Sequence, residues 1–234
     1  MNILDFNKTI LIISGLPCIG KTTIAYELIK KYPQFRSVTE MDIMRTVLRK
    51  AIENLETNNI FNNVNIKEYY ENLFNSLRES SYDIACEQSK QLLPFVKDII
   101  FRQQRRNIPT IIEGAEIIPI TFFDDNQKVC WINDNIIFIY LYIADEAEHK
   151  RRRINRCKTR GYNINEANEI KIVYKIRNEK HIRFLRDAQN LSKTNNNIFT
   201  IDISNKSIEE VCGLIIKRIE RYYNNINLNT AHDL

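Results

Sequence analysis

The chain has 234 residues, of which 44% are hydrophobic, 27% charged and 10% aromatic, as is usual for a globular domain. Only 5 Gly and 5 Pro occur in this length, which excludes collagen-like and low-complexity chains. A net charge of +5 suits an anionic ligand but is weaker than in most dedicated nucleic-acid binders. The 5 Cys are widely spaced, so neither a disulfide framework nor a zinc site is predicted.

The hydrophobic residues are distributed as in a protein without a membrane anchor. The longest apolar run, Ile136 to Ile143, is under half of the roughly 20 residues that a membrane span needs. The apolar run near the N-terminus leads into a Gly-containing loop instead of a cleavage site. We therefore expect a cytoplasmic protein with no membrane partner, and the sequence leaves its oligomeric state open.

Five short apolar runs have the length and continuity of strands that are covered on both faces. They are Thr9–Ser14, Arg36–Thr39, Pro109–Glu113, Asn135–Ile143 and Asn197–Asp202. Long segments with helical spacing separate them. This alternation predicts an α/β protein of three layers, in which helices cover both faces of a five-stranded, mostly parallel sheet.

We expect a single domain over residues 1–223, followed by a C-terminal tail over residues 224–234. A helical insertion, residues 43–107, separates the second and third strands, and we expect it to be broken by the Asn-rich residues 57–65 and by Pro94. An Arg-rich lid is expected at residues 145–170. A long helix over residues 165–192 and another over residues 208–223 complete the fold.

The segment Gly15-Leu-Pro17-Cys18-Ile19-Gly20-Lys21-Thr22 matches the phosphate-binding pattern G-x-x-x-x-G-K-[ST], between a strand and a helix. Such a loop curls its backbone N–H groups around phosphates, so Gly15, Pro17, Cys18, Ile19, Gly20, Lys21, Thr22 and Thr23 are the predicted nucleotide-binding residues. Lys21 would reach the β- and γ-phosphates, and the Thr22 hydroxyl would bind Mg²⁺. Cys18 is interpreted as a small filler of the loop, with a redox role as the alternative.

Asp42 and Arg45 follow the second strand and share one face of a helix start. A carboxylate there can accept the proton of an attacking hydroxyl, and a guanidinium one turn later can hold an anionic group of the same substrate. This pattern predicts a phosphate-acceptor site. The alternatives are that Asp42 only caps the helix, or that Glu40 is the base.

Glu113 ends the third strand at the same predicted edge of the sheet. It could hold Mg²⁺ through water, orient the substrate, or form a loop salt bridge. Further along, Arg152 and Arg156 lie four residues apart, so both could reach nucleotide phosphates from the lid and stabilise the charge on the transferred group. A solvated basic face and a contact with a nucleic-acid backbone are the alternatives.

In combination these motifs resemble the archaeal-type 2-phosphoglycerate kinases, a group of P-loop kinases similar to the nucleoside monophosphate kinases. The similar segments are the phosphate loop, Asp42-x-x-Arg45-x-x-Leu48-Arg49, Glu113-Gly114-x-x-x-x-Pro119, His149-x-x-Arg152-x-x-x-Arg156, and Ile182-Arg183. The resemblance implies ATP and Mg²⁺ as cofactors, Lys21, Asp42, Arg152 and Arg156 as catalytic residues, and Asp42, Arg45, Glu113 and Arg183 as substrate-binding residues. Thr22 and Glu113 are implied at the metal.

The implied substrate is a small hydroxy compound that is phosphorylated or carboxylated. One residue departs from the pattern: the family has His where this chain has Glu116, and a carboxylate there would repel a substrate anion. Two rival functions stay open. The first is a polynucleotide 5′-hydroxyl kinase, and the second is a nucleotide-binding regulatory protein without small-molecule turnover. Tyr69, Tyr70 and Tyr82 of the insertion, with Arg78, could contact the substrate or pack in the core.

Overall fold

The computed structural model describes residues 6–57, 81–122, 135–161 and 165–232. Its strands are β1 (Ile10–Gly15), β2 (Ser37–Glu40), β3 (Thr110–Gly114), β4 (Ile136–Tyr142) and β5 (Ile198–Asp202). Its α-helices are α1 (Lys21–Lys31), α2 (Met41–Thr57), α4 (Tyr82–Arg105), α5 (Glu146–Thr159), α6 (Glu166–Ile176), α7 (Ile182–Thr194) and α8 (Ile208–His232). Short 3₁₀ segments, η1 (Phe6–Lys8) and η3 (Pro119–Phe122), and a π-helical segment, η4 (Arg177–His181), complete the described structure.

The five strands form one sheet in the order β2-β3-β1-β4-β5, and every pair is parallel. The expected α/β architecture is therefore confirmed. Because all strands run in one direction, the phosphate loop after β1, the start of α2 after β2 and the turn after β3 emerge at the same edge of the sheet. The register brings Glu40 of β2 beside Glu113 of β3.

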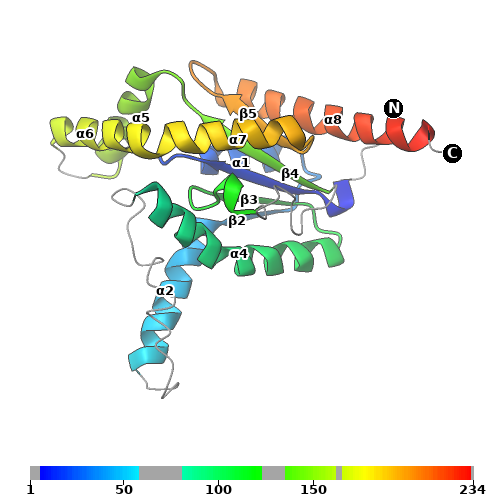
Figure 1. Cartoon of the computed structure of the whole chain (residues 1–234), viewed down its shortest axis with the longest axis horizontal. Coiled ribbons are helices and arrows are strands. Elements are labelled where there is room, and N and C mark those ends of the chain that lie inside the picture. The colour runs from blue at the N-terminus through cyan, green and yellow to red at the C-terminus, as the bar shows by residue number, and fades with distance from the viewer. Residues whose placement is uncertain (1–5, 58–80, 123–134, 162–164, 233–234) are drawn as a thin grey trace.

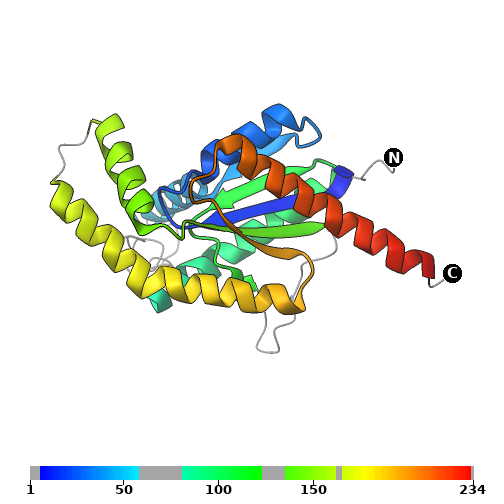
Figure 2. The same cartoon turned by 90° about the horizontal axis from the view of Figure 1, so that it is seen from above.

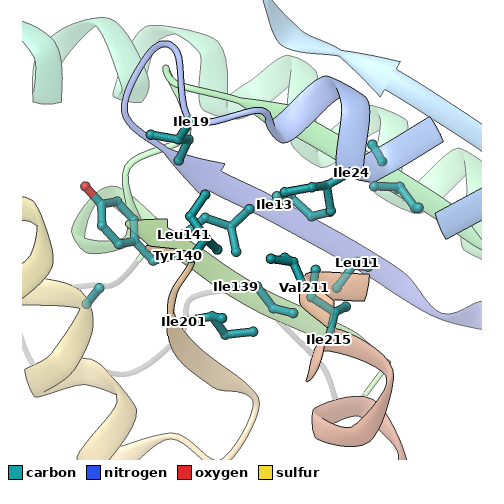
Figure 3. Packing of buried hydrophobic residues seen from close by; sticks show 14 of the residues in the cluster. Leu11, Ile13, Ile19, Ile24, Ile139, Tyr140, Leu141, Ile201, Val211 and Ile215 are labelled. Carbon is teal, nitrogen blue, oxygen red and sulfur yellow. The ribbon is translucent and has the colours of Figure 1, made fainter. Parts of the chain in front are cut away.

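Both faces of the sheet are covered by helices, which explains why β1, β3 and β4 are almost wholly buried, whereas the edge strand β2 (Ser-Val-Thr-Glu) is only half-buried. On one face, Leu11 and Ile13 of β1 pack with α1 and with Val211 and Ile215 of α8 (Figure 3). On the other face, Ile10 and Ile12 pack with α2, α4 and α7. Figure 2 shows α8 crossing the sheet beside α1, so the first and last helices of the domain cover the same face.

Pro94 does not break the insertion as the sequence predicted. It lies inside α4, which is continuous from Tyr82 to Arg105. Proline in a helix interior costs about 3 kcal/mol. Pro94 is exposed, while Leu92, Val96 and Ile100 of the same helix are buried against the sheet. Burial of this apolar face outweighs the cost of the proline, at roughly 1.5–3 kcal/mol for each buried side chain. Of the Asn-rich residues 57–65, those after Thr57 lie outside the described residues.

Two further helices differ from the expected boundaries. The helix expected over residues 165–192 is divided into α6 and α7 by the π-helical turn at Arg177–His181, yet the two lie almost end to end (Figure 1). The final helix was expected to end at Tyr223 but continues to His232. No Gly or Pro follows Gly213 within this helix, so nothing in the sequence stops its propagation at Tyr223.

None of the helices among the described residues combines the length and the apolar character that crossing a membrane would require.

Candidate active site

The phosphate loop follows β1 with the backbone conformation that its glycines permit. Gly15 has φ 141°, and a Cβ placed on it would lie 2.3 Å from the carbonyl oxygen of Leu141 in β4. Gly20, at the start of α1, has φ 90°, in the left-handed region that favours glycine. Ile19 is buried in the same cluster as Ile13, so the core holds the middle of the loop in place (Figure 3). The loop is therefore both curled and anchored.

Lys21, the first residue of α1, is buried beneath this loop. Its Nζ donates to the carbonyl oxygen of Leu16 at 3.0 Å. Burial lowers the pKa of Lys21, although the negative charges of Glu113, Glu116 and Asp42 oppose this shift. The carboxyl groups of Glu113, Glu116 and Asp42 are therefore near enough to Lys21 for their charges to act on it.

Thr22 and Glu113 place two oxygen donors side by side. The Thr22 hydroxyl donates to Glu113 Oε1 at 2.7 Å, and Glu113 is buried. Burial raises the pKa of Glu113, while Thr22 and the charge of Lys21 act in the opposite direction. Mg²⁺ prefers oxygen ligands, usually one or two from protein together with water and phosphate, so this pair fits a nucleotide-bound Mg²⁺. Thr23, the next residue, is exposed on α1.

Asp42 lies in the first turn of α2, with its side chain 69% exposed. Arg45 lies between two carboxylates: its Nη2 is 3.5 Å from Asp42 Oδ1, and its Nη1 is 3.5 Å from Glu116 Oε1. The expected closeness of Asp42 and Arg45 is thus present. Glu40, the rival base, accepts a hydrogen bond of 2.8 Å from the Tyr26 hydroxyl.

Glu116, where the sequence departs from the resembled pattern, was not among the predicted site residues but contacts one of them, Arg45. It is 1% exposed and follows the turn at Gly114, where a Cβ would lie 2.7 Å from Met41 Cβ and 3.2 Å from Glu116 Oε2. Burial, a hydrogen bond with Asp42 and the Asp42 charge raise the pKa of Glu116 to about 7. The replacement of His by Glu in the strand-end pattern was the signal that could have identified it.

The lid helix α5 lies directly on the phosphate loop. His149 Nε2 is 3.1 Å from the carbonyl oxygen of Pro17, and Arg152 Nη1 donates to that of Ile19 at 3.3 Å. Cys18, in a left-handed conformation with φ 68°, has its Sγ 3.6 Å from Arg153 Nη1 and 3.8 Å from Arg156 Nη1. The Arg-rich segment of α5 therefore contacts the phosphate loop, and its role as a lid stays a prediction.

The lid arginines have different partners. Arg152 donates twice to Glu148 Oε1, from Nε at 2.9 Å and from Nη2 at 2.5 Å. Arg153 donates to Glu169 of α6 at 2.7 Å, which joins the two lid helices. Arg156 is close enough to Asp42 for its positive charge to lower the pKa of that carboxyl. Arg156 is thus near both Cys18 of the phosphate loop and Asp42.

Arg183, expected to bind substrate, contacts protein groups on a different part of the molecule. Its guanidinium stacks 3.5 Å from the ring centroid of Tyr82, and its Nη2 is 3.6 Å from Asp83 Oδ1. Tyr82 in turn donates to Asp187 at 2.5 Å, so this cluster links α4 to α7. Its substrate role stays a prediction. Tyr69, Tyr70 and Arg78 lie outside the described residues.

No protein-family model and no curated protein matches the chain. Among solved structures, a gluconokinase from Sinorhizobium meliloti 1021 matches with a TM-score of 0.53 and 11% identity, over 95% of this chain and 97% of that one. The chain has the P-loop kinase fold. A deoxyadenosine kinase from M. mycoides has a TM-score of 0.42 and 17% identity, over 91% and 100% of the two chains. A shikimate kinase from Bacteroides thetaiotaomicron has a TM-score of 0.38 and 12% identity, over 97% and 99%.

Within this P-loop kinase fold, most of the predicted site residues come together. The loop residues, Thr22 with Glu113, Asp42 with Arg45, and the lid arginines surround the edge of the sheet after β1, β2 and β3. Arg183 and Thr23 have no contact with this group among the contacts described above. Glu116, His149 and Arg153 join it through contacts between segments that are distant in the sequence.

Proposed function

We propose that the chain is an ATP- and Mg²⁺-dependent kinase that transfers the γ-phosphoryl group to a hydroxyl of a small molecule. The observation that carries this proposal is that the phosphate loop after β1, Asp42 after β2 and Glu116 after β3 lie at the same edge of the parallel sheet, with Thr22 bonded to Glu113 and Arg45 paired with Asp42 and Glu116. A kinase needs this combination because the γ-phosphoryl group must lie between its binding loop and the attacking hydroxyl.

On the nucleotide side, the backbone N–H groups of the loop and Lys21 bind the phosphates. When the nucleotide binds, Lys21 Nζ exchanges its hydrogen bond to the Leu16 carbonyl oxygen for contacts with the β- and γ-phosphates. The phosphates then give the buried ammonium group a negatively charged partner. Thr22 and Glu113 hold Mg²⁺, directly or through water. When bound, Mg²⁺ would supply positive charge that offsets the negative charge of the phosphates.

On the acceptor side, Asp42 orients the substrate hydroxyl and takes its proton. Burial acts to raise its pKa, but the hydrogen bond with Glu116 and the charges of Arg45, Lys21 and Arg156 hold the pKa below its usual range. Asp42 is therefore ionised near pH 7 and ready to accept a hydrogen bond from the hydroxyl. Arg156 and Lys21 stabilise the charge on the transferred group, and the lid excludes water from it.

The gluconokinase supports this proposal at the level of the fold, and the motif resemblance favours a 2-phosphoglycerate kinase-like reaction. The test begins with ATP consumption in the presence of Mg²⁺. Its acceptors are 2-phosphoglycerate, other hydroxy acids, sugars, nucleosides, aminoglycosides and oligonucleotides with a 5′-hydroxyl. A Lys21→Ala variant is the blank, since it lacks the phosphate-binding cation. Phosphorylation of an oligonucleotide alone would favour the polynucleotide kinase.

Changing Asp42 to Asn should abolish transfer while leaving ATP binding in place. The amide keeps the shape of the side chain but accepts no proton, so kcat should fall by about 10²–10⁴-fold. ATP affinity, measured by calorimetry, should stay within about threefold of wild type, because no hydrogen bond or ion pair joins Asp42 to the phosphate loop among the described residues.

Asp98→Asn is the matched control, because Asp98 is an exposed aspartate on α4. It should leave both kcat and ATP affinity unchanged. If the Asp42→Asn variant turned over at the wild-type rate, Asp42 would not be the base and this mechanism would be wrong. ATP binding without turnover on any acceptor would instead support the nucleotide-switch function.

A further inference from the structure

The proposed reaction assigns no step to Glu116, yet this carboxyl group is one of the most deeply buried ionisable groups at the site. Its side chain is 1% exposed, and neither Oε1 nor Oε2 receives a hydrogen bond among the described residues. A buried carboxyl group usually accepts hydrogen bonds, yet the nearest cation beside Glu116, Arg45 Nη1, is 3.5 Å away and makes no hydrogen bond with it. The missing donor points to a ligand.

The neighbouring guanidinium has matching unused groups. Arg45 Nε and Nη1 are buried and donate no hydrogen bond among the described residues, although Nη1 is 3.5 Å from Glu116 Oε1. Arg45 and Glu116 therefore present donors and acceptors next to each other, beside the exposed Asp42 carboxylate. A hydroxyl group both donates and accepts, so it suits such a pair.

The local charge disfavours an anion at the same place. The positive charge of Arg45 is balanced by Asp42 on one side and Glu116 on the other. A carboxylate or phosphate of the acceptor would have to displace one of them and leave a negative group in the buried site. Like charges held together in this way cost several kcal/mol. Burial, together with the hydrogen bond with Asp42 and the Asp42 charge, raises the pKa of Glu116, so this position already disfavours a negative charge.

We propose that Glu116 and Arg45 form an acceptor subsite for a neutral polyhydroxy compound, such as a sugar, a sugar alcohol or a nucleoside. The reacting hydroxyl binds Asp42, while a second hydroxyl donates to Glu116 and accepts from Arg45. Arg45 is then a positioning residue rather than a clamp for a substrate anion. This inference rests on the proposed kinase function, whose acceptor class it specifies.

The test compares neutral acceptors with charged counterparts that keep the hydroxyl pattern. Sorbitol and gluconate, ribitol and ribonate, glycerol and glycerate, and nucleosides with their 5′-monophosphates form matched pairs, with 2-phosphoglycerate as a further anionic member. Binding is measured by calorimetry on the full chain with Mg²⁺ and a non-hydrolysable ATP analogue, and phosphorylation of the same compounds is measured with ATP. At least one neutral member should bind about tenfold or more tightly than its anionic counterpart.

Glu116→Gln tests whether this preference comes from Glu116. The amide still donates and accepts hydrogen bonds but carries no charge, so the neutral member should bind within about threefold of wild type and the anionic member about tenfold more tightly. Glu87→Gln, an exposed position on α4, is the control and should leave the ratio unchanged. If Glu116→Gln does not fold, as judged by thermal unfolding, the ratio measured on wild type still decides.

The outcomes separate this inference from the proposed function. Preference for an anionic member, equal binding of both members, or binding of no neutral compound would overturn the acceptor class. Preferred phosphorylation of 2-phosphoglycerate would overturn it while supporting the kinase. A neutral compound that binds through Glu116 but is never phosphorylated would support the subsite and count against the kinase.

Discussion

Asp42 and Glu116 are two neighbouring carboxyl groups whose pKa values move in opposite directions. Burial would raise the pKa of Asp42, but a hydrogen bond with Glu116 and the charges of Arg45, Lys21 and Arg156 lower it. For Glu116, burial, the hydrogen bond with Asp42 and the Asp42 charge all act together and raise the pKa to about 7. The pair therefore shares one proton below pH 7, with the charge concentrated on Asp42, the proposed base.

This shift predicts how stability depends on pH. The folded chain holds a proton on Glu116 up to about pH 7, while the unfolded chain releases it above its usual value near pH 4.3. Between these values the folded state binds more protons, so Glu116 lowers the free energy of unfolding progressively as pH rises and imposes its full cost above pH 7. The stability of Glu116→Gln relative to wild type should accordingly increase from pH 5 to pH 8, by roughly 2–3 kcal/mol.

Urea unfolding of both proteins at several pH values measures this difference. Glu87→Gln, at an exposed position, provides a control in which the difference from wild type should stay constant with pH. A Glu116→Gln difference that is equally constant would mean that Glu116 ionises normally in the folded chain.

At the scale of elements, the end of α4 illustrates how local chemistry positions the site. Ile108 N donates to the carbonyl of Gln103 at 3.0 Å and Asn107 N to that of Gln104 at 3.1 Å, which together form a Schellman motif. Asn107 has φ 53°, the left-handed conformation that this motif requires. The turn reverses the chain into β3, which carries Glu113 to the site.

Substitutions at Asn107 should follow this backbone conformation. Asn107→Ala should lower the free energy of unfolding by about 1 kcal/mol, because alanine adopts the left-handed region at a cost. Asn107→Gly should be neutral or slightly stabilising, because glycine adopts it freely. Thermal unfolding of the two variants checks this order, and an alanine variant as stable as the glycine variant would contradict it.

Helix α5 is a second element whose contacts position the site. The spacing of its basic residues does not show which of them contacts which residue of the phosphate loop. His149, Arg152, Arg153 and Arg156 all reach Pro17, Cys18 or Ile19. Asp145 caps the helix by accepting from Ala147 N at 2.8 Å and Glu148 N at 3.2 Å. The helix start and the arginine pattern were readable in the sequence, but the partners of each arginine were not.

At the scale of the whole molecule, the site is built from segments that are far apart in the sequence. The phosphate loop, the start of α2, the turn after β3 and helix α5 come together at one edge of the sheet. Ligand binding at this edge should therefore stabilise the entire domain. A ligand that binds only the folded state adds RT ln(1 + [L]/Kd), which is about 2.7 kcal/mol at one hundred times Kd. We expect the midpoint of thermal unfolding to rise with the logarithm of ATP concentration in the presence of Mg²⁺.

Lys21→Ala should lose most of this concentration dependence, because the buried ammonium is a main phosphate contact in the proposed function. Lys90→Ala, at an exposed position of α4, should keep it. Equal stabilisation of Lys21→Ala and wild type by ATP would place the nucleotide elsewhere.

Local regularities allowed the sequence by itself to determine the strands, the phosphate loop and the Asp42–Arg45 pair. The strands β1, β3 and β4 are covered on both faces and are therefore mostly apolar, and each of the five strands lies within a residue or two of its predicted bounds. The loop is a contiguous motif set by backbone conformation, and residues three apart in a helix share a face whatever surrounds them.

Only the tertiary structure decided which distant segments meet. The insertion of β3 between β2 and β1 brings Glu116 to Arg45, and the docking of α5 places Cys18 between two arginines. Packing also decided that Pro94 stays within α4 and that Arg183 lies against Tyr82. These outcomes depend on burial summed over the whole domain, a long-range quantity that outweighs the local preference of any single residue.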